Sequence, residues 1–179
     1  VFDGEILTSV GHPAGSFYGY KTKGVFSTQA EAEMAYITPP QTSSYPNTYL
    51  KLKNEDGPFS NFTAGDIFFD DFDNNGIIDE KDKQIIGDPN PDFYGNIFSK
   101  IFIKKFTLSA VFAYSIGNDI YNYSRSLLEA GKDFSNQTTV MLNRWTGDAQ
   151  ITNQPKAVFG DPMGNSRFSD RWIEDGSYI

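Results

Sequence analysis

Cysteine is absent from the sequence, so neither a disulfide nor a metal site with thiolate ligands can form. His12 is the single histidine, which excludes metal centres built from several imidazoles. Apolar runs are too short for a membrane-spanning helix, which needs about 18 or more consecutive apolar residues. Basic residues are also scarce: 15 Lys and Arg face 23 Asp and Glu, and the formal net charge is −8. Because phosphate binding needs a basic patch, these counts argue against a nucleic-acid partner.

Aromatic residues make up 16 % of the 179 residues, with 16 Phe and 10 Tyr, and 16 glycines accompany them. Together with many Asn, Asp and Ser, this composition favours β-structure with long polar loops over a helical bundle. None of the GxSxG, P-loop or HExxH patterns occurs, and no Asp or Glu stands out as an acid with a tuned pKa. We therefore predict that the chain is not an enzyme. It opens at Val1 without an initiating methionine or a signal peptide, which indicates a piece of a longer protein.

A calcium-like loop lies at 71–82, where the sequence reads DFDNNGIIDEKD. Oxygen-bearing groups can fill positions 1, 3, 5, 7, 9 and 12 of the loop, and glycine at position 6 permits the sharp turn that such loops need. Because Asp, Asn and Gly are also the commonest turn residues, a tight turn without a cation is the alternative interpretation. The predicted calcium ligands are Asp71, Asp73, Asn75, the carbonyl of Ile77, Asp79 and Asp82.

The kind of calcium site can be narrowed further. The last ligand position holds Asp82 rather than the bidentate Glu of a helix–loop–helix calcium hand. The residues before the loop, 67–69, look extended rather than helical. We therefore expect a structural calcium clip instead of a signalling switch. The loop belongs to a longer stretch, 66–95, in which the proline-marked segment 88–92 breaks any helix and leads into a strand.

Two strands of roughly 9–11 residues, the length that crosses an outer membrane, are predicted at 92–103 and 106–116. The pair Lys104-Lys105 is expected to make a tight turn between them, which gives an antiparallel hairpin. In the second strand, large apolar side chains alternate with small or hydroxyl ones, as in any half-buried strand. Alternation alone leaves a soluble β-sandwich and an outer-membrane barrel both open.

Helices are expected to be few and short. The segment 27–37 predicts a helix with a capping box between Thr28 and Glu31, and the residues Thr38-Pro39-Pro40 end it. The other expected elements are a short amphipathic helix at 136–145 and a long loop over 41–65 that contains one strand at 49–53.

Several short segments, spread over nearly the whole chain, form a characteristic series when taken in order. The segments are VGHPAGSFYGYKT at 10–22, GDI at 65–67, DFDNNGIIDEKD at 71–82, IGDPNP at 86–91, SIGNDIYN at 115–122, RWT at 144–146 and SRFSDRWIEDGSY at 166–178. On these segments, the chain resembles the C-terminal part of the SusC/RagA family of TonB-dependent outer-membrane transporters of Bacteroidetes-type bacteria. Two positions depart from the family pattern: His12 stands at a variable position, and Asn75 replaces the more usual Asp.

The resemblance implies a mainly β fold, with antiparallel strands from part of an outer-membrane β-barrel, long loops and a few short helices. It implies that residues 1–179 are a single fragment of the C-terminal barrel region, without the plug domain and the TonB box. Such transporters import oligosaccharides or peptides with energy from TonB, which would act through the missing N-terminal region. A SusD-like lipoprotein serves as their extracellular lid. The expected location is the cell outer membrane, where lipid surrounds the barrel.

The resemblance also places the segments on the two sides of the membrane. In the family's topology the turn at Lys104-Lys105 is periplasmic, and the segments 27–90 and 118–166 are extracellular. The calcium-like loop would then stiffen a surface loop near the lid or the substrate. The resemblance ties no residue of this chain to a substrate.

A protein of another class is the alternative: a secreted calcium-stabilised β-module that binds glycan through exposed aromatics such as Tyr18, Tyr20 and Trp145. Two observations separate the two interpretations. A gene that continues into further barrel strands on both sides would favour the transporter. So would a chain that needs detergent or a partner to cover an apolar strand face.

Overall fold

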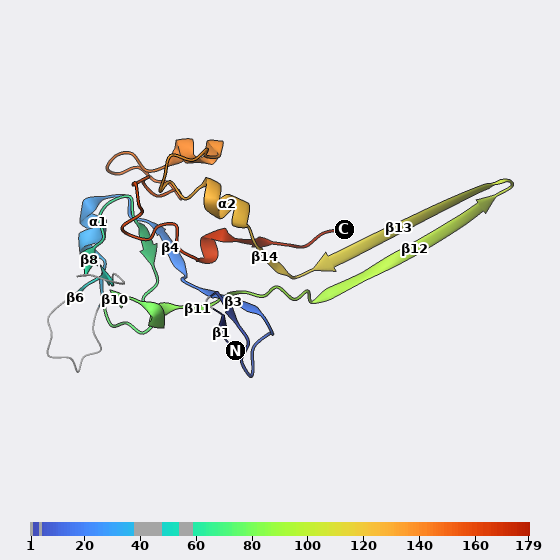
Figure 1. Ribbon diagram of the computed structural model, residues 1–179, viewed down its shortest axis with the longest axis horizontal. Coiled ribbons are helices and arrows are strands. Elements are labelled where there is room, and N and C mark those ends of the chain that lie inside the picture. The colour runs from blue at the N-terminus through green and yellow to red at the C-terminus, as the bar shows by residue number, and fades with distance from the viewer. Residues whose placement is uncertain (1, 4, 38–47, 54–58) are drawn as a thin grey trace. The chain divides into compact units, whose positions relative to one another are not determined.

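The computed structural model of the chain describes residues 2–3, 5–37, 48–53 and 59–179. Antiparallel strands dominate, with a few short helices between long loops (Figure 1). Among these residues, no helix combines the length and the apolar character that crossing a membrane demands. The chain groups into two compact units. The first comprises Val1–Tyr18, Ile85–Tyr121 and Ile173–Ile179, and the second comprises Gly19–Gln84 and Asn122–Trp172.

The first unit contains most of a small four-stranded sheet and a separate pair of strands. The sheet has the order β1-β2-β3-β11, with β1 at Phe2–Asp3, β2 at Ile6–Leu7, β3 at Ser16–Gly19 and β11 at Gln84–Gly87. The antiparallel pair is β14 (Asp119–Tyr121) with β15 (Ile173–Asp175). The backbone N–H of Asp119 donates to the carbonyl of Asp88 over 2.7 Å, and its carboxylate accepts from the N–H of Asp88 over 2.8 Å. These bonds fix the start of the proline-marked segment.

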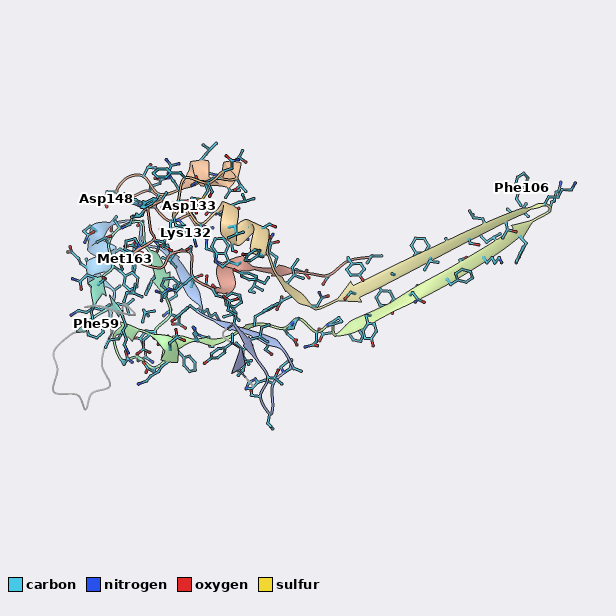
Figure 2. All side chains as sticks on the ribbon, viewed as in Figure 1. Phe59, Phe106, Lys132, Asp133, Asp148 and Met163 are labelled. Carbon is cyan, nitrogen blue, oxygen red and sulfur yellow. The ribbon has the colours of Figure 1, made fainter. Side chains whose placement is uncertain are left out.

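A long antiparallel hairpin, predicted from the sequence, follows that segment. β12 (Phe93–Ile103) and β13 (Phe106–Ile116) have 11 residues each. They pair without a break, from Phe93 opposite Ile116 to Ile103 opposite Phe106. Lys104 lies in the connection with a left-handed φ of 54°, as two-residue hairpin turns require. The two strands form a sheet of their own, and Figure 2 shows Phe106 at its turn end.

The two faces of this hairpin differ in chemistry. Residues directly opposite each other in an antiparallel pair share a face. One face carries mostly large apolar side chains, all of them exposed: Phe93, Ile97, Ile101, Ile103, Phe106, Leu108, Phe112 and Ile116. The other face is mixed and consists of Tyr94, Asn96, Phe98, Lys100, Phe102, Thr107, Ser109, Val111, Ala113 and Ser115. An exposed apolar face of this extent is typical of a surface that a lipid phase or a partner covers.

The second unit is built around a hydrophobic core. Its buried members are Tyr20, Phe26, Ala32, Leu50, Leu52, Phe62, Ile67, Phe69, Ile78 and Met163. Short strands supply many of them. β4 (Thr22–Val25) pairs with β9 (Ile67–Phe69), and β5 (Tyr36–Ile37) pairs with β6 (Thr48–Tyr49). A three-stranded sheet has the order β10 (Ile77–Ile78), β7 (Lys51–Leu52), β8 (Ser60–Asn61). Phe69, Leu52 and Ile78 are at most 2 % exposed. Burial of such side chains stabilises strands that are too short to persist alone.

Two of the predicted helices differ from the structure. α1 spans Gln29–Met34, and Thr28 caps it as predicted by accepting from the N–H of Glu31 over 3.1 Å. It is shorter than predicted because β5 begins at Tyr36; the proline stop predicted at 38–40 lies outside the described residues. The helix predicted at 136–145 is wrong. Only the 3₁₀ helix η2 (Thr139–Asn143) forms there, because β-branched residues open it and its N-cap makes no side-chain hydrogen bond.

The sequence expectations also miss one helix and several strands. α2 (Tyr123–Leu128) begins at Asn122, whose side chain accepts from the N–H of Arg125 over 2.9 Å. Arg125 in turn pairs with Glu129 one turn later, at 3.0 Å. The strand predicted at 49–53 is present in part as β7, whereas β6, which ends at Tyr49, and β8 were not predicted. The remaining short helices are η1 (Glu80–Asp82) and η3 (Asp170–Trp172).

Candidate metal centre

The loop 71–82 is anchored in the core of the second unit at both ends. β9 precedes it and ends on the fully buried Phe69, and β10 within it carries the fully buried Ile78. β10 runs parallel to β7: the N–H of Lys51 donates to the carbonyl of Gly76 over 3.0 Å, and that of Lys53 donates to Ile78 over 3.1 Å. Successive carbonyls of a strand point to opposite edges. The carbonyl of Ile77, the predicted ligand at position 7, is therefore directed away from β7.

The sharp turn predicted at Gly76 is present. Asn74 and Gly76 both have left-handed φ values, 55° and 87°, which Asn tolerates and Gly adopts without strain. The carboxylate of Asp71 closes the turn by accepting from the N–H of Gly76 over 2.8 Å and from that of Asn75 over 3.2 Å. Backbone and side chains thus fold around Asp71, the first predicted ligand.

Three of the predicted ligands are brought together. Asp71, Asp73 and Asp82 each offer a carboxylate oxygen, and these oxygens lie within 4.8 Å of one another. Asp71 and Asp82 are buried, at 8 % and 0 % exposed, whereas Asp73 is exposed. Oxygen donors converging in this way are the ligand type that a hard cation such as calcium prefers.

The other predicted ligands are engaged in local hydrogen bonds. The Oδ1 atom of Asn75 accepts from the N–H of Ile77 over 2.7 Å, and its Nδ2 atom donates to Asp73 over 2.9 Å. Asp79 caps η1 by accepting from the N–H of Lys81 over 2.9 Å. It also lies 3.8 Å from the ammonium of Lys53. Asp79 therefore does not join the three converging carboxylates in this arrangement.

Burial makes negative charge costly at the two interior carboxylates. Asp82 accepts from the N–H groups of Phe72 and Asp79 over 2.9 and 2.7 Å, yet burial, reinforced by the charge of Asp71, raises its pKa to about 6. Burial also raises the pKa of Asp71, against the lowering effect of its backbone hydrogen bonds, and the charge of Asp73 adds to the rise. Among the described residues, the cations paired with this loop reach Asp79 and Glu80 and none reaches Asp71 or Asp82.

A second polar cluster, which sequence reasoning misses, lies around Asp66. Its carboxylate is fully buried and accepts from the N–H and hydroxyl of Thr63, each at 2.9 Å, and from Nδ2 of Asn165 at 3.0 Å. The ammonium of Lys156 completes the set at 3.1 Å. The only indication of this cluster in the sequence is the segment GDI at 65–67. Two partners of Asp66, Lys156 and Asn165, lie 90 or more residues further along the chain. This cluster ties the start of β9 to a distant loop.

The aromatics proposed as a glycan platform are not freely exposed: Tyr18 and Trp145 are half-buried, and Tyr20 is buried. Tyr20 is 6 % exposed, and its hydroxyl donates to Glu80 over 3.3 Å. Burial raises its pKa well above the usual range. The indole N–H of Trp145 donates to the carbonyl of Ser27 over 3.0 Å, and its ring lies against Gly65. Both side chains are therefore parts of the packed second unit.

Curated proteins similar to this chain are TonB-dependent receptors of Formosa agariphila. TonB-dependent receptor P3 is 32 % identical over 169 residues, which cover 94 % of this chain and 14 % of P3. TonB-dependent receptor P39 is 25 % identical over 192 residues, which cover 98 % of this chain and 18 % of P39. TonB-dependent receptor P26 is 23 % identical over 170 residues, which cover 95 % of this chain and 15 % of P26. The chain thus spans less than a fifth of the length of these relatives. No model of a known protein family matches it.

Solved structures of the RagAB peptide importer share the fold. Its 'closed-closed' state matches with a TM-score of 0.58 at 20 % identity, covering 97 % of this chain and 16 % of that chain. Its 'open-open' state matches with a TM-score of 0.61 at 19 % identity, and the match covers 99 % of this chain and 16 % of the importer chain. The predicted fold class is confirmed, although the described strands do not close into a barrel. All these relatives are named receptors or importers, which agrees with the prediction that the chain is not an enzyme.

Proposed function

We propose that the chain is part of a TonB-dependent outer-membrane transporter of the SusC/RagA type, which imports oligosaccharides or peptides with a SusD-like lipoprotein. The observation that carries this proposal is the similarity to TonB-dependent receptor P3, which extends over 94 % of the chain. Similarity along nearly the whole chain supports a shared architecture better than a single motif would. The additional length of the relatives would supply the region that contacts TonB and the other barrel strands.

The hairpin supports placement in a membrane barrel. Its strands have 11 residues each, close to the roughly 9–11 that cross an outer membrane. Charged side chains are costly at the lipid surface near the middle of a membrane strand, and Lys100 lies in the middle part of β12. The face of Phe112 is therefore assigned to lipid and the face of Lys100 to the barrel interior. The turn at Lys104 would then be periplasmic.

The substrate class has less support than the architecture. RagAB is named a peptide importer, which favours peptides, whereas the family resemblance allows oligosaccharides as well. The secreted glycan-binding module is not favoured, because none of its three proposed aromatics is fully exposed: Tyr20 is buried, and Tyr18 and Trp145 are half-buried.

The test is deletion of the gene in its own bacterium. We expect loss of growth on one class of oligosaccharide or peptide, and restoration by the wild-type gene but not by one lacking the TonB-contacting region. Purification from outer membranes should recover a lipoprotein with the receptor. Recovery of the protein from the culture medium, with uptake unaffected, would overturn the proposal in favour of the secreted module.

Within this transporter, we propose that the loop 71–82 is a structural calcium clip. The converging carboxylates of Asp71, Asp73 and Asp82 and the orientation of the Ile77 carbonyl support it. The raised pKa values of Asp71 and Asp82 support it further, because a bound cation would offset charge that no Lys or Arg among the described residues neutralises. Asn75 and Asp79 would have to exchange their local hydrogen bonds for the ion. The clip would stiffen an extracellular loop.

A further inference from the structure

The turn of the loop 71–82 contains the only Asn-Gly pair of the sequence, Asn75-Gly76. Asn-Gly is the pair in which backbone attack on the side-chain amide is least hindered, because glycine has no side chain to shield its nitrogen. The side chain of Asn75 is exposed to solvent, and the N–H of Gly76 is buried. Such a pair is a candidate for spontaneous deamidation wherever the local geometry allows the ring to close.

We propose that Asn75 is a deamidation site that the closed turn protects and that opening of the turn activates. The step is intramolecular. The Gly76 nitrogen loses its proton and bonds to Cγ of Asn75, the Cγ–Nδ2 bond breaks, and ammonia leaves with a proton taken from water. Water then opens the cyclic imide at either carbonyl, which leaves aspartate or isoaspartate at position 75.

The attacking nitrogen is restrained by Asp71. The N–H of Gly76 donates to Oδ2 of Asp71 over 2.8 Å in a buried setting. A carboxylate that accepts this proton disfavours the negative nitrogen that attack requires. The hydrogen bond also directs the nitrogen toward Asp71, whereas ring closure requires it to approach the side chain of Asn75.

The attacked side chain is restrained at both of its polar atoms. Oδ1 of Asn75 accepts from the N–H of Ile77 over 2.7 Å, and Nδ2 donates to Oδ2 of Asp73 over 2.9 Å. Rotation of Cγ toward the Gly76 nitrogen would break both bonds. Nucleophile and electrophile are thus held separately by two different carboxylates.

Deamidation would not be neutral for the turn. Either product replaces the Nδ2 donor of Asn75 by a charged oxygen facing Asp73, so an attraction at 2.9 Å becomes a repulsion. Isoaspartate also adds a methylene to the backbone just before β10, which disturbs the pairing of Ile77–Ile78 with Lys51–Leu52. A single opening that leads to the imide would therefore favour further opening of the turn. Because the reaction is irreversible, the modified residue 75 records that the turn has opened.

Asn165-Ser166 is an internal control for this experiment, because an Asn-Ser pair is also prone to deamidation. Asn165 is 3 % exposed, its Nδ2 atom donates to Asp66 over 3.0 Å, and the N–H of Ser166 donates to Asp161 over 2.7 Å. This site lies in the buried polar cluster and not in the turn. Asn165 converts only when the second unit opens, whereas Asn75 converts also when the turn alone opens.

The experiment follows both sites by peptide-mapping mass spectrometry during incubation at mildly alkaline pH, on the longest natural form of the chain in detergent. A calcium chelator is present throughout, because an ion in the proposed clip would replace the hydrogen bonds of Asn75. We expect Asn75 to convert much more slowly in the native protein than in urea. Asp71→Ala and Asp73→Ala should each raise the rate at Asn75 roughly tenfold, while Asn165 stays unchanged. Asp71→Ala frees the N–H of Gly76, and Asp73→Ala frees the amide of Asn75, from its charge-assisted hydrogen bond.

The remaining outcomes also decide the matter. Equal rates at Asn75 in native and urea-unfolded protein would overturn the proposal without any variant. If Asp71→Ala accelerates both sites, the second unit has unfolded, and Asp73→Ala, a change at an exposed side chain, then decides between the two possibilities. Unchanged Asn75 conversion in Asp73→Ala would mean that the turn does not protect the site.

Discussion

At the scale of single residues, the molecule shows two ways of burying carboxylates. Asp66 is fully buried and has a lysine, an amide and a threonine as partners. Asp82 is equally buried, but its hydrogen-bond donors are backbone N–H groups, and another carboxylate, Asp71, lies beside it. The first is a completed structural cluster, whereas the second has the charge imbalance expected of a cation site.

Removal of calcium is the first prediction. A chelator should lower the melting temperature of the wild-type protein, because calcium at roughly 100 times its Kd would contribute about 2.7 kcal/mol to the folded state. Asp82→Asn should abolish this response by removing a predicted ligand charge. Differential scanning calorimetry with metal analysis provides the measurement.

The matched control for this prediction is Asp133→Asn, the same chemical change at an exposed position outside the loop. It should respond to the chelator as the wild type does. A melting temperature and a metal content that both stay constant on chelation would mean that 71–82 is only a tight turn.

The second prediction concerns Asp66. Asp66→Ala should lower the free energy of unfolding by about 3 kcal/mol, because it leaves Lys156 and Asn165 without their shared buried partner. Chemical denaturation followed by tryptophan fluorescence measures the change. Asp133→Ala should stay close to the wild type, and an equally small effect at Asp66 would show that the cluster is dispensable.

The two clusters also differ in how well sequence predicts them. The turn at Gly76 could be predicted because its residues lie within twelve positions, and the φ of 87° is one that glycine favours. The hydrogen bonds of Asn75 and Asp79 could not, because composition does not tell which oxygen faces a backbone N–H. The Asp66 cluster was missed because the chain must fold before Asn165 and Lys156 come within reach.

At the scale of elements, the hairpin was the most predictable part of the chain. Its pairing is local, its turn has two residues, and the side chains of β13 alternate over 11 positions. The two-residue strands of the second unit carry no such period, so apart from β7, which falls within the strand predicted at 49–53, they are visible only through burial. α2 was missed because its cap at Asn122 and its pair Arg125–Glu129 are weak signals in an otherwise loop-like segment.

The hairpin gives the third prediction. Phe112 and Val111 are neighbours on β13 and similarly exposed, at 57 % and 63 %, but they lie on opposite faces. Phe112→Lys should lower the yield of folded protein, because in the proposed placement this lysine would face lipid near the middle of the membrane, which costs about 2–4 kcal/mol. Val111→Lys should be tolerated, since it shares the face of Lys100.

Heat-modifiable migration in gel electrophoresis measures the folded fraction of both variants in outer membranes. Equal losses would show that the faces are not divided between lipid and interior. A loss confined to Val111→Lys would reverse the assignment of the two faces.

At the scale of the whole molecule, the chain corresponds to a piece of its relatives, since it covers 14 % of TonB-dependent receptor P3. The prediction that residues 1–179 form a single barrel fragment stays a prediction, and the described residues group into two compact units. The second unit has a buried core of its own, whereas the hairpin of the first exposes both faces. A two-stranded ribbon with free edges is not stable alone in water.

This contrast gives the last prediction. Produced by itself, the chain should require detergent or form oligomers, because the apolar face of the hairpin is exposed and, among the described residues, its outer edges are paired only at the bridge between Ser115 and Tyr178. The residues flanking the hairpin, Asp92 and Gly117, lie against each other, so 93–116 can be replaced by a short glycine linker. The shortened chain should become monomeric without detergent, as light scattering coupled to gel filtration can measure. A monomeric, detergent-free wild-type chain would mean that the hairpin is covered from within, and would weaken the placement of Phe112 and its neighbours against lipid.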